Sequence, residues 1–190
     1  MQLPPPQNTR PSNGSSTPPL PLPSQCQSQN VKFTISTKNW NNEGIEAAWK
    51  PAPYEPERAW SVYGVCKTQA EQKMWEFVKE KKPGFVLNAV LPNSNMGKIL
   101  SNKQPASTGG SVRSLYDCDV SPLKNITPQS MVNVKDTARL HVAALLDLDV
   151  ENERILAFAH PFNCNETLAC LRRMYPIRSF LRTLRIIRRT

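Results

Sequence analysis

Between about residue 31 and residue 176, short runs of apolar residues alternate with stretches in which apolar positions recur every three or four residues. The first pattern is typical of strands buried on both faces, and the second of amphipathic helices. Their alternation predicts an α/β fold with a largely parallel sheet. In chain order we expect strands at 31–35, 85–91, 131–134 and 154–159. Helices are expected at 43–49, from 57 or 60 to 80, from the turn around Asp136 to about Leu148, and at 165–174.

The longest predicted helix, which ends near Glu80, has well-marked boundaries. The proline-rich segment 51–58 precedes it and cannot be regular structure, because proline removes donors and restricts the residue before it. An apolar stripe at helical spacing runs from Val62 to Val78. The sequence Lys81-Lys82-Pro83-Gly84 follows and predicts the end of the helix.

Other boundaries follow from polar residues. Asp136 is expected in the first turn of its helix, where a carboxylate suits the positive end of the dipole. Asn163 or Asn165 is expected to cap the last helix. Periodicity is poor from Lys98 to Gln129, so we expect loops and short helical pieces there.

The two ends of the chain differ from the middle in composition. Eight of the eighteen prolines lie before Ser24, among Ser, Gln and Asn, so we expect residues 1–30 to be disordered. Five arginines lie in the last fourteen residues, which contain no acid. Without them the net charge of +9 would fall to +4, an ordinary value for a soluble enzyme. The charge is therefore a property of the tail 177–190, and we expect no nucleic-acid partner.

The tail also has an apolar pattern. Helical spacing would place Ile177, Phe180, Leu181, Leu184 and Ile187 on one face and the arginines on the other. This arrangement is typical of a helix that lies on an anionic membrane surface. An altered reading frame or an incorrect gene model would produce such a tail by accident, and we favour that reading.

Cysteine and histidine usage excludes other classes. The five cysteines form no C-x-x-C pair and are odd in number, which favours a reduced intracellular compartment. His141 and His160 have no metal-ligand spacing around them, so we expect no metal. No signal-peptide pattern is present, and no apolar run approaches the ~20 residues needed to span a bilayer. We therefore expect a cytoplasmic protein without stable membrane insertion.

Tyr63 and Lys67 are the first candidates for chemistry. Four residues apart on the long helix, they lie on one face, one turn from each other. A lysine ammonium near a phenol lowers the pKa of the phenol, and a tyrosine so placed can donate a proton to a carbonyl oxygen. Taken alone the spacing is a weak signal, because a half-buried tyrosine beside a solvated lysine is common.

The surroundings of this pair resemble a known family. The block 59–72, Ala-Trp-Ser-Val-Tyr-Gly-Val-Cys-Lys-Thr-Gln-Ala-Glu-Gln, is similar to the active-site helix of the extended short-chain dehydrogenase/reductases, most of all to fungal aldehyde and carbonyl reductases related to dihydroflavonol reductase. The strand and proline of 86–93 and the later block 132–145, in which V-x-V-x-D-x-A-x-x-H occurs, follow in the family's order. The likeness covers about 30–176.

The resemblance implies roles for individual residues. Tyr63 would be the general acid, and Lys67 its partner and a ligand of the cofactor ribose. Pro92, Asn93 and Asn95 would lie against the nicotinamide end of NAD or NADP. Met96 and the loop through Gln129 would shape the substrate pocket. Each of these last residues also has a plain structural reading, since Pro92 suits any exit from a strand and Met96 suits a core.

The chain departs from the family in two further places. It has no Gly-rich turn of the G-x-G-x-x-G kind, which holds the cofactor pyrophosphate. The resemblance therefore implies an incomplete Rossmann-like parallel sheet, with the dinucleotide-binding half missing. The catalytic serine is equally open: Ser15-Ser16-Thr17 resembles a remnant of it, with Ser16 as the candidate, or is a chance cluster.

The function implied by the resemblance is reduction of a small aldehyde or ketone by NADPH or NADH, or the reverse reaction. Two alternatives stay open. One is a truncated, inactive relative that does not bind the cofactor. The other is a basic module that binds membrane or nucleic acid through the tail, although few aromatics accompany its arginines.

Overall fold

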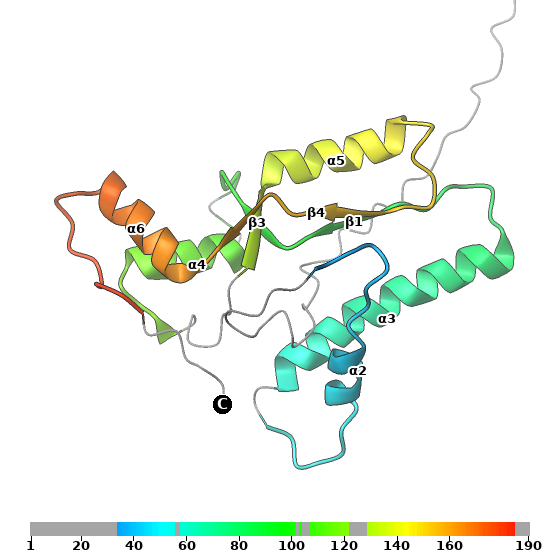
Figure 1. Ribbon diagram of the computed structural model, residues 1–190, viewed down its shortest axis with the longest axis horizontal. Coiled ribbons are helices and arrows are strands. Elements are labelled where there is room, and N and C mark those ends of the chain that lie inside the picture. Colours follow the sequence, from blue (N-terminus) through cyan, green and yellow to red (C-terminus); the bar gives the residue numbers. More distant parts are fainter. Residues whose placement is uncertain (1–33, 56–57, 102, 104–106, 122–128, 185–190) are drawn as a thin grey trace, which may run out of the picture.

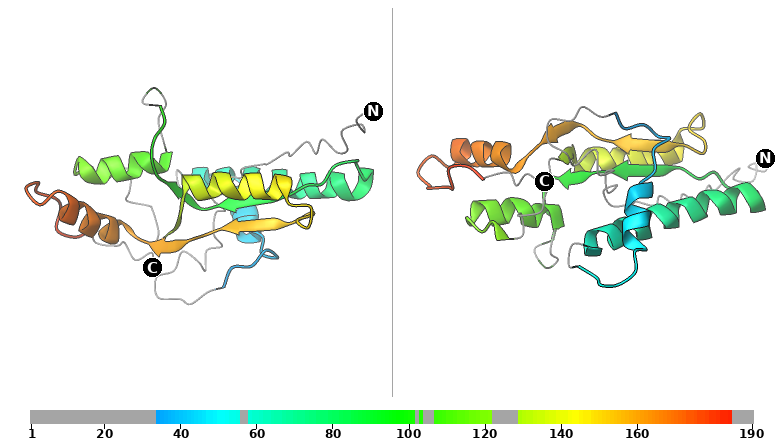
Figure 2. Two further views of the ribbon diagram at one scale, coloured as in Figure 1. Left: turned by 90° about the horizontal axis from the view of Figure 1, so that it is seen from above. Right: turned by 60° about the horizontal axis from the view of Figure 1, so that its bottom comes forward.

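The computed structural model describes residues 34–55, 58–101, 103, 107–121 and 129–184. Its centre is a layered arrangement in which β1 (Ala89–Pro92) and β4 (Arg154–Ala157) pair in parallel. Helix α5 (Val134–Leu146) lies on one side of these strands and helix α3 (Arg58–Lys81) on the other (Figure 1, Figure 2). The predicted α/β class with parallel strands is confirmed.

A second small sheet continues the first. It contains β2 (Ser94–Met96), β3 (Gln129–Asn133) and β5 (His160–Phe162), with β2 parallel and β5 antiparallel to β3. We predicted one strand over 154–159, and this was wrong in extent. After Ala157 the chain no longer pairs with β1 and turns toward β3, where the N–H of Ala159 donates to the carbonyl of Met131 at 2.9 Å.

Strand β1 is shorter than the predicted strand 85–91. The residues before Ala89 are held by the side chain of Asn88 instead of by a ladder of backbone bonds. Its Oδ1 accepts from the N–H of Glu153 at 2.9 Å, and its Nδ2 donates to the carbonyls of Ala144 at 3.0 Å and Val150 at 2.9 Å. Asn88 therefore ties β1 to the end of α5 and to the turn before β4.

The remaining helices are α2 (Asn42–Ala48), α4 (Ser107–Tyr116) and α6 (Cys164–Met174). α2 and α6 agree with the prediction, and α4 is one of the helical pieces expected in the aperiodic region. Asn163 caps α6 through a capping box with Glu166, which decides between the two predicted caps. α5 begins at Val134, because the side chain of Asn133 caps it by accepting from the N–H of Lys135 at 2.9 Å, and Asp136 lies in its first turn as predicted.

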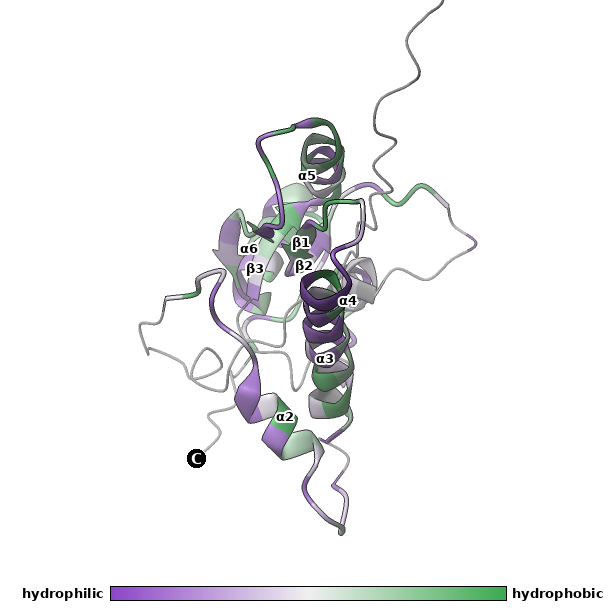
Figure 3. Cartoon of the chain, turned by 90° about the vertical axis from the view of Figure 1, so that its right-hand side faces the viewer, coloured by the Kyte–Doolittle hydropathy of each residue, from purple (hydrophilic) through white to green (hydrophobic). Residues whose placement is uncertain are grey.

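Apolar side chains form two separate clusters. The first joins the strands under α5, and Figure 3 shows hydrophobic colouring at β1 between α3 and α5. The second lies between α4 and α6. The buried members are Val90, Val132 and Ala157 in the first, and Leu115, Leu168 and Leu171 in the second.

The C-terminal residues 177–184 are not helical, so the amphipathic helix that their spacing would allow does not form there. Phe180 and Leu184 pack against the α4–α6 cluster, while Ile177 is fully exposed. The Asn165 side chain bonds both the carbonyl and the N–H of Leu184, at 3.1 and 2.8 Å. Helix formation would break these contacts, which explains the difference. Residues 185–190, including Ile187, lie outside the described residues.

Two further expectations concern the other end of the chain and the membrane. Residues 1–30, and 31–33 of the first predicted strand, lie outside the described residues; Thr34 and Ile35, which are described, belong to no strand. Among the helices that the structure describes, none combines the length and the apolar character needed to cross a bilayer.

Candidate active site

Helix α3 carries the Tyr63–Lys67 pair in its N-terminal half. The Lys67 Nζ lies 5.9 Å from the centroid of the Tyr63 ring. Tyr63 is 38% exposed, whereas Val65 and Thr68, on the neighbouring face of the helix, are buried. The two side chains therefore lie together at the border between the packed and the solvent-facing sides of α3, as their spacing predicts.

The end of α3 follows from its sequence. The helix stops at Lys81, and Lys82 takes a positive φ of 45° while its N–H still bonds the carbonyl of Val78 at 3.0 Å. Lys79 and Lys81 occupy the last turn, where cations suit the negative end of the dipole. The chain then reverses and runs into β1. As a result, the carboxyl end of β1 and the amino end of α3 point toward the same side of the structure (Figure 1).

The electrostatics of Tyr63 differ from the expectation. We expected the Lys67 ammonium to lower the pKa of the phenol. Instead, burial raises the pKa of Tyr63 above its ordinary value. A charge more than 5 Å from the ring is attenuated by the solvent that reaches an exposed side chain, so desolvation is the larger effect. Tyr63 therefore keeps its proton at neutral pH.

Pro92, Asn93 and Ser94 are buried where β1 passes into β2. The Asn93 side chain is completely buried, and its Oδ1 accepts from the Ser94 hydroxyl at 3.3 Å. Its Nδ2 has no hydrogen-bond partner in the described part of the chain. A buried amide donor without an acceptor costs free energy, so this N–H group suits an acceptor supplied from elsewhere.

Asn95 is oriented by residues that the sequence did not indicate. Its Oδ1 accepts from the hydroxyl of Thr137 in α5 at 2.6 Å, and its backbone carbonyl accepts from the hydroxyl of Thr108 in α4. Met96, half-buried, pairs with Asn133 in the β2–β3 register. Thr137 belongs to the block 132–145 that resembles the family, whereas Thr108 lies in the aperiodic region and had no sequence signal.

The other candidates have separate places. His141 Nδ1 lies 2.8 Å from the carbonyl of Thr137, which is a structural contact within α5, and His160 is exposed on β5. In the described ranges, no three or more His, Cys, Asp or Glu side chains are grouped so that they could hold a metal ion. Ser16 lies outside the described residues, and its role stays a prediction. The structure thus leaves two groups: the Tyr63–Lys67 pair and the Pro92–Asn95 turn.

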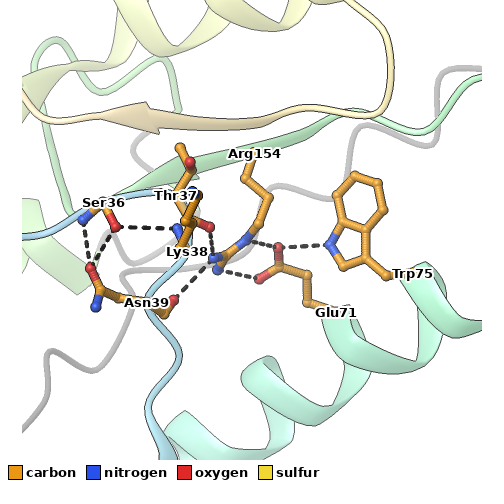
Figure 4. A network of polar contacts seen from close by, with 7 residues as sticks. All are labelled: Ser36, Thr37, Lys38, Asn39, Glu71, Trp75 and Arg154. Atoms are coloured by element: carbon orange, nitrogen blue, oxygen red, sulfur yellow. Dashed lines mark hydrogen bonds and ion pairs between the residues drawn. The ribbon is translucent and has the colours of Figure 1, made fainter.

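A third feature near α3 was missed entirely. Glu71 of α3 and Arg154 of β4 form an ion pair with 2% and 9% of their side chains exposed (Figure 4). The charge pattern of the long helix predicts Glu71 on its solvated face, and this was wrong because Arg154 pairs with it. Arg154 itself was expected only as the first residue of a strand. Only the tertiary structure brings them together, since 82 residues separate them in the chain.

Comparison with known proteins gives relatives of one kind. The chain is 42% identical over 148 residues to the NAD-dependent epimerase/dehydratase terH of Aspergillus terreus. The matched region is 76% of this chain and 43% of that protein. It is 38% identical over 148 residues to aldehyde reductase 2 of Sporidiobolus salmonicolor, covering 77% and 43%. No family model matches the sequence.

Solved structures agree on the fold. The structure of Gre2 from Candida albicans in complex with NADPH matches with a TM-score of 0.62 and 21% identity, over 80% of this chain and 44% of that one. This likeness shows a Rossmann-type fold, as the sequence resemblance implied. The chain spans less than half the length of the relatives that it matches. Over the matched region, the chain is similar to NAD-dependent epimerase/dehydratases and aldehyde reductases, in agreement with the resemblance to extended short-chain dehydrogenase/reductases seen in its sequence.

Proposed function

We propose that this chain carries the proton-donating part of an NAD(P)H-dependent carbonyl reductase that acts on a small aldehyde or ketone. The observation that carries the proposal is the Tyr63–Lys67 pair at the amino end of α3, on the side toward which β1 ends. The names of the relatives, an aldehyde reductase and a ketoreductase among them, support the same class of substrate. Reduction and the reverse oxidation use the same groups.

In this proposal Tyr63 is the general acid. Its phenol, like that of any tyrosine whose pKa is not lowered, is protonated at neutral pH, and it donates that proton to the carbonyl oxygen of the substrate. When bound, NAD(P)H supplies the hydride that the carbonyl carbon receives. The Lys67 ammonium stabilises the phenolate that remains after proton transfer, since an opposite charge favours the ionised form.

The Pro92–Asn95 turn is proposed to receive the nicotinamide end of the cofactor. The buried Asn93 Nδ2 without a partner fits the acceptor oxygen of a carboxamide, and the Pro92 ring offers an apolar surface. The Thr137 hydroxyl donates to Asn95 Oδ1 and thereby leaves the Asn95 Nδ2 as a donor. Lys67 would bind hydroxyl groups of the ribose, as the family resemblance implies. The choice between NAD and NADP is not part of the proposal.

The second candidate is a chain with this catalytic helix but without cofactor binding. One observation favours it: burial raises the pKa of Tyr63, whereas a general acid works best with a pKa lowered toward neutral pH. The two candidates differ in one measurable property, which is saturable binding of a reduced nicotinamide nucleotide.

The test is fluorescence titration of the purified chain with NADPH and NADH, together with an assay of carbonyl reduction. Tyr63→Phe is the test variant, and Tyr54→Phe, an exposed tyrosine in the loop before α3, is its matched control. We expect both variants to bind the nucleotide and only Tyr63→Phe to lose turnover. The absence of saturable binding to the folded parent chain would reject the reductase and favour the second candidate.

A further inference from the structure

The ion pair between Glu71 and Arg154 differs from the other ion pairs of the described residues. The Arg154 Nε donates to Glu71 Oε1 at 2.7 Å, and Nη2 donates to Oε2 at 3.2 Å (Figure 4). This two-point geometry is the one that a planar guanidinium forms with a carboxylate. The remaining ion pairs, such as Lys73–Glu76 in the same helix, have both side chains at least two-fifths exposed.

Arg154 also holds the segment that precedes α2. Its Nη1 donates to the backbone carbonyls of Thr37 and of Asn39, the latter at 3.0 Å. Its guanidinium carbon lies 3.9 Å from the ring centroid of Trp40, within the range of a cation–π contact. One side chain therefore connects β4, α3 and residues 37–40.

Glu71 is fixed in turn by its own helix. The indole Nε1 of Trp75 donates to Glu71 Oε1 at 3.1 Å, so both carboxylate oxygens accept hydrogen bonds. Removing one partner would leave a buried charge without compensation, which is much more costly than losing an exposed pair. The network is consequently selective for one arrangement of the elements it joins.

Those elements are the ones that carry the candidate site. Glu71 lies one helical turn after Lys67 and two turns after Tyr63 in α3. Arg154 is opposite Ala89 in the β1–β4 register, and β1 ends three residues later at Pro92. The ion pair thus joins the helix of the proton donor to the strand that leads to the proposed nicotinamide turn.

We propose that Glu71 and Arg154 are positioning residues, which set the axial position of α3 against β4 and so place Tyr63 relative to the Pro92–Asn95 turn. The functional half of this inference rests on the proposed reductase, whereas the structural half does not. A shift of α3 along its axis would move Tyr63 and Lys67 together. Such a shift would alter proton transfer more than nucleotide binding, because proton transfer depends on a hydrogen-bond distance.

Matched variants of the full chain test the inference. Glu71→Gln and Arg154→Lys keep the size of each side chain but remove the carboxylate charge or the two-point fork. Glu76→Gln, exposed on the same helix, and Arg139→Lys, exposed on α5, are the controls. Glu71→Met with Arg154→Met replaces the pair by apolar groups, a change that often preserves folding. The measurements are hydrogen exchange in residues 58–67 and 36–42, tryptophan fluorescence, and the kcat and KM of carbonyl reduction.

For Glu71→Gln and Arg154→Lys we expect faster exchange in both segments, altered tryptophan fluorescence, and a kcat lowered on the order of tenfold to a hundredfold with KM within about twofold. The double Met variant should fold and show the same kcat loss, which excludes a simple loss of stability. The controls should match the parent. Parent-like exchange in 58–67 and 36–42 for the test variants, or parent-like kcat in the double Met variant, would overturn the inference.

The two proposals fail in different ways. A parent chain that binds no nicotinamide nucleotide would reject the reductase, while faster exchange in the test variants alone would still support the positioning of α3. If instead turnover is lost in Tyr63→Phe but unchanged in the Glu71 and Arg154 variants, the proposed reductase stands and the positioning role of Glu71 and Arg154 is rejected.

Discussion

Gly97 is a position where a single added methyl group should be costly for both backbone and packing reasons. This residue follows β2 and has a φ of +146°, a conformation that residues with a Cβ rarely adopt. A Cβ added there would lie 2.8 Å from Cγ1 of Val134, the first residue of α5. Gly97→Ala therefore combines backbone strain with a steric clash.

The magnitude follows from these two terms. Backbone strain of this kind costs about 1–3 kcal/mol. Overpacking by one methyl group costs a further amount of about 1–3 kcal/mol, reduced here because Val134 is 41% exposed and has room to rotate. We expect the free energy of unfolding to fall by about 2–4 kcal/mol, a large share of the ~5–15 kcal/mol of a typical domain. Urea unfolding followed by far-ultraviolet circular dichroism measures it.

Two companion variants make the test decisive. Adding Val134→Ala to Gly97→Ala removes the clash but keeps the strain, so it should recover part of the loss. Gly110→Ala in α4 is the control, because a Cβ there meets nothing within 4 Å and alanine favours a helix interior. Gly110→Ala should stabilise the chain by about 0.5–1 kcal/mol. An unfolding midpoint of Gly97→Ala equal to that of the parent would refute the reasoning.

Three other predictions follow from the described contacts. Asn163→Ala should lower the free energy of unfolding by about 1 kcal/mol, because it removes the α6 capping box; an unchanged urea midpoint would contradict this. Because the folded state raises the pKa of Tyr63, its contribution to stability is complete below the pKa of the unfolded phenol, near 10, and is lost as the pH rises through the folded pKa. Unfolding at high pH should therefore be less pH-dependent in Tyr63→Phe than in the parent. Phe180 is only partly buried against the α4–α6 cluster. Phe180→Ala should therefore lower the free energy of unfolding by less than the about 3–5 kcal/mol expected for a fully buried ring, and thermal unfolding measures the loss.

The sequence predicted those parts of the fold that have a local cause. Hydrophobic periodicity located α2, α3, α5 and α6, and the Lys81–Gly84 signal located the end of α3. The strands were less accurate, since their limits depend on partners elsewhere in the chain. β1 begins only at Ala89, where β4 becomes available, and the run after Arg154 divides because two different strands lie beside it.

The candidate site shows the same division. Tyr63 and Lys67 were predictable because a helix fixes the relation of residues four apart. The direction of the pKa shift of Tyr63 was not, because it depends on burial by residues distant in sequence. The same holds for Thr137 and Thr108 at Asn95, which reach it from two other helices.

The C-terminal segment and the buried ion pair show why charge patterns alone misled the sequence reading. Arg172 donates to the carbonyls of Leu181 and Arg182, and the Arg178 guanidinium lies 4.1 Å from the Tyr116 ring centroid. Arg172 of α6 and Arg178 therefore hold the segment on α4 and α6. Of the two, only Arg178 belongs to the tail whose spacing is also typical of a membrane-binding face. Glu71 likewise was expected on the solvated face of its helix, and instead it pairs with Arg154 in a buried network. A guanidinium supplies five donors on a long side chain, so its role depends on which carbonyls and carboxylates the fold brings within reach.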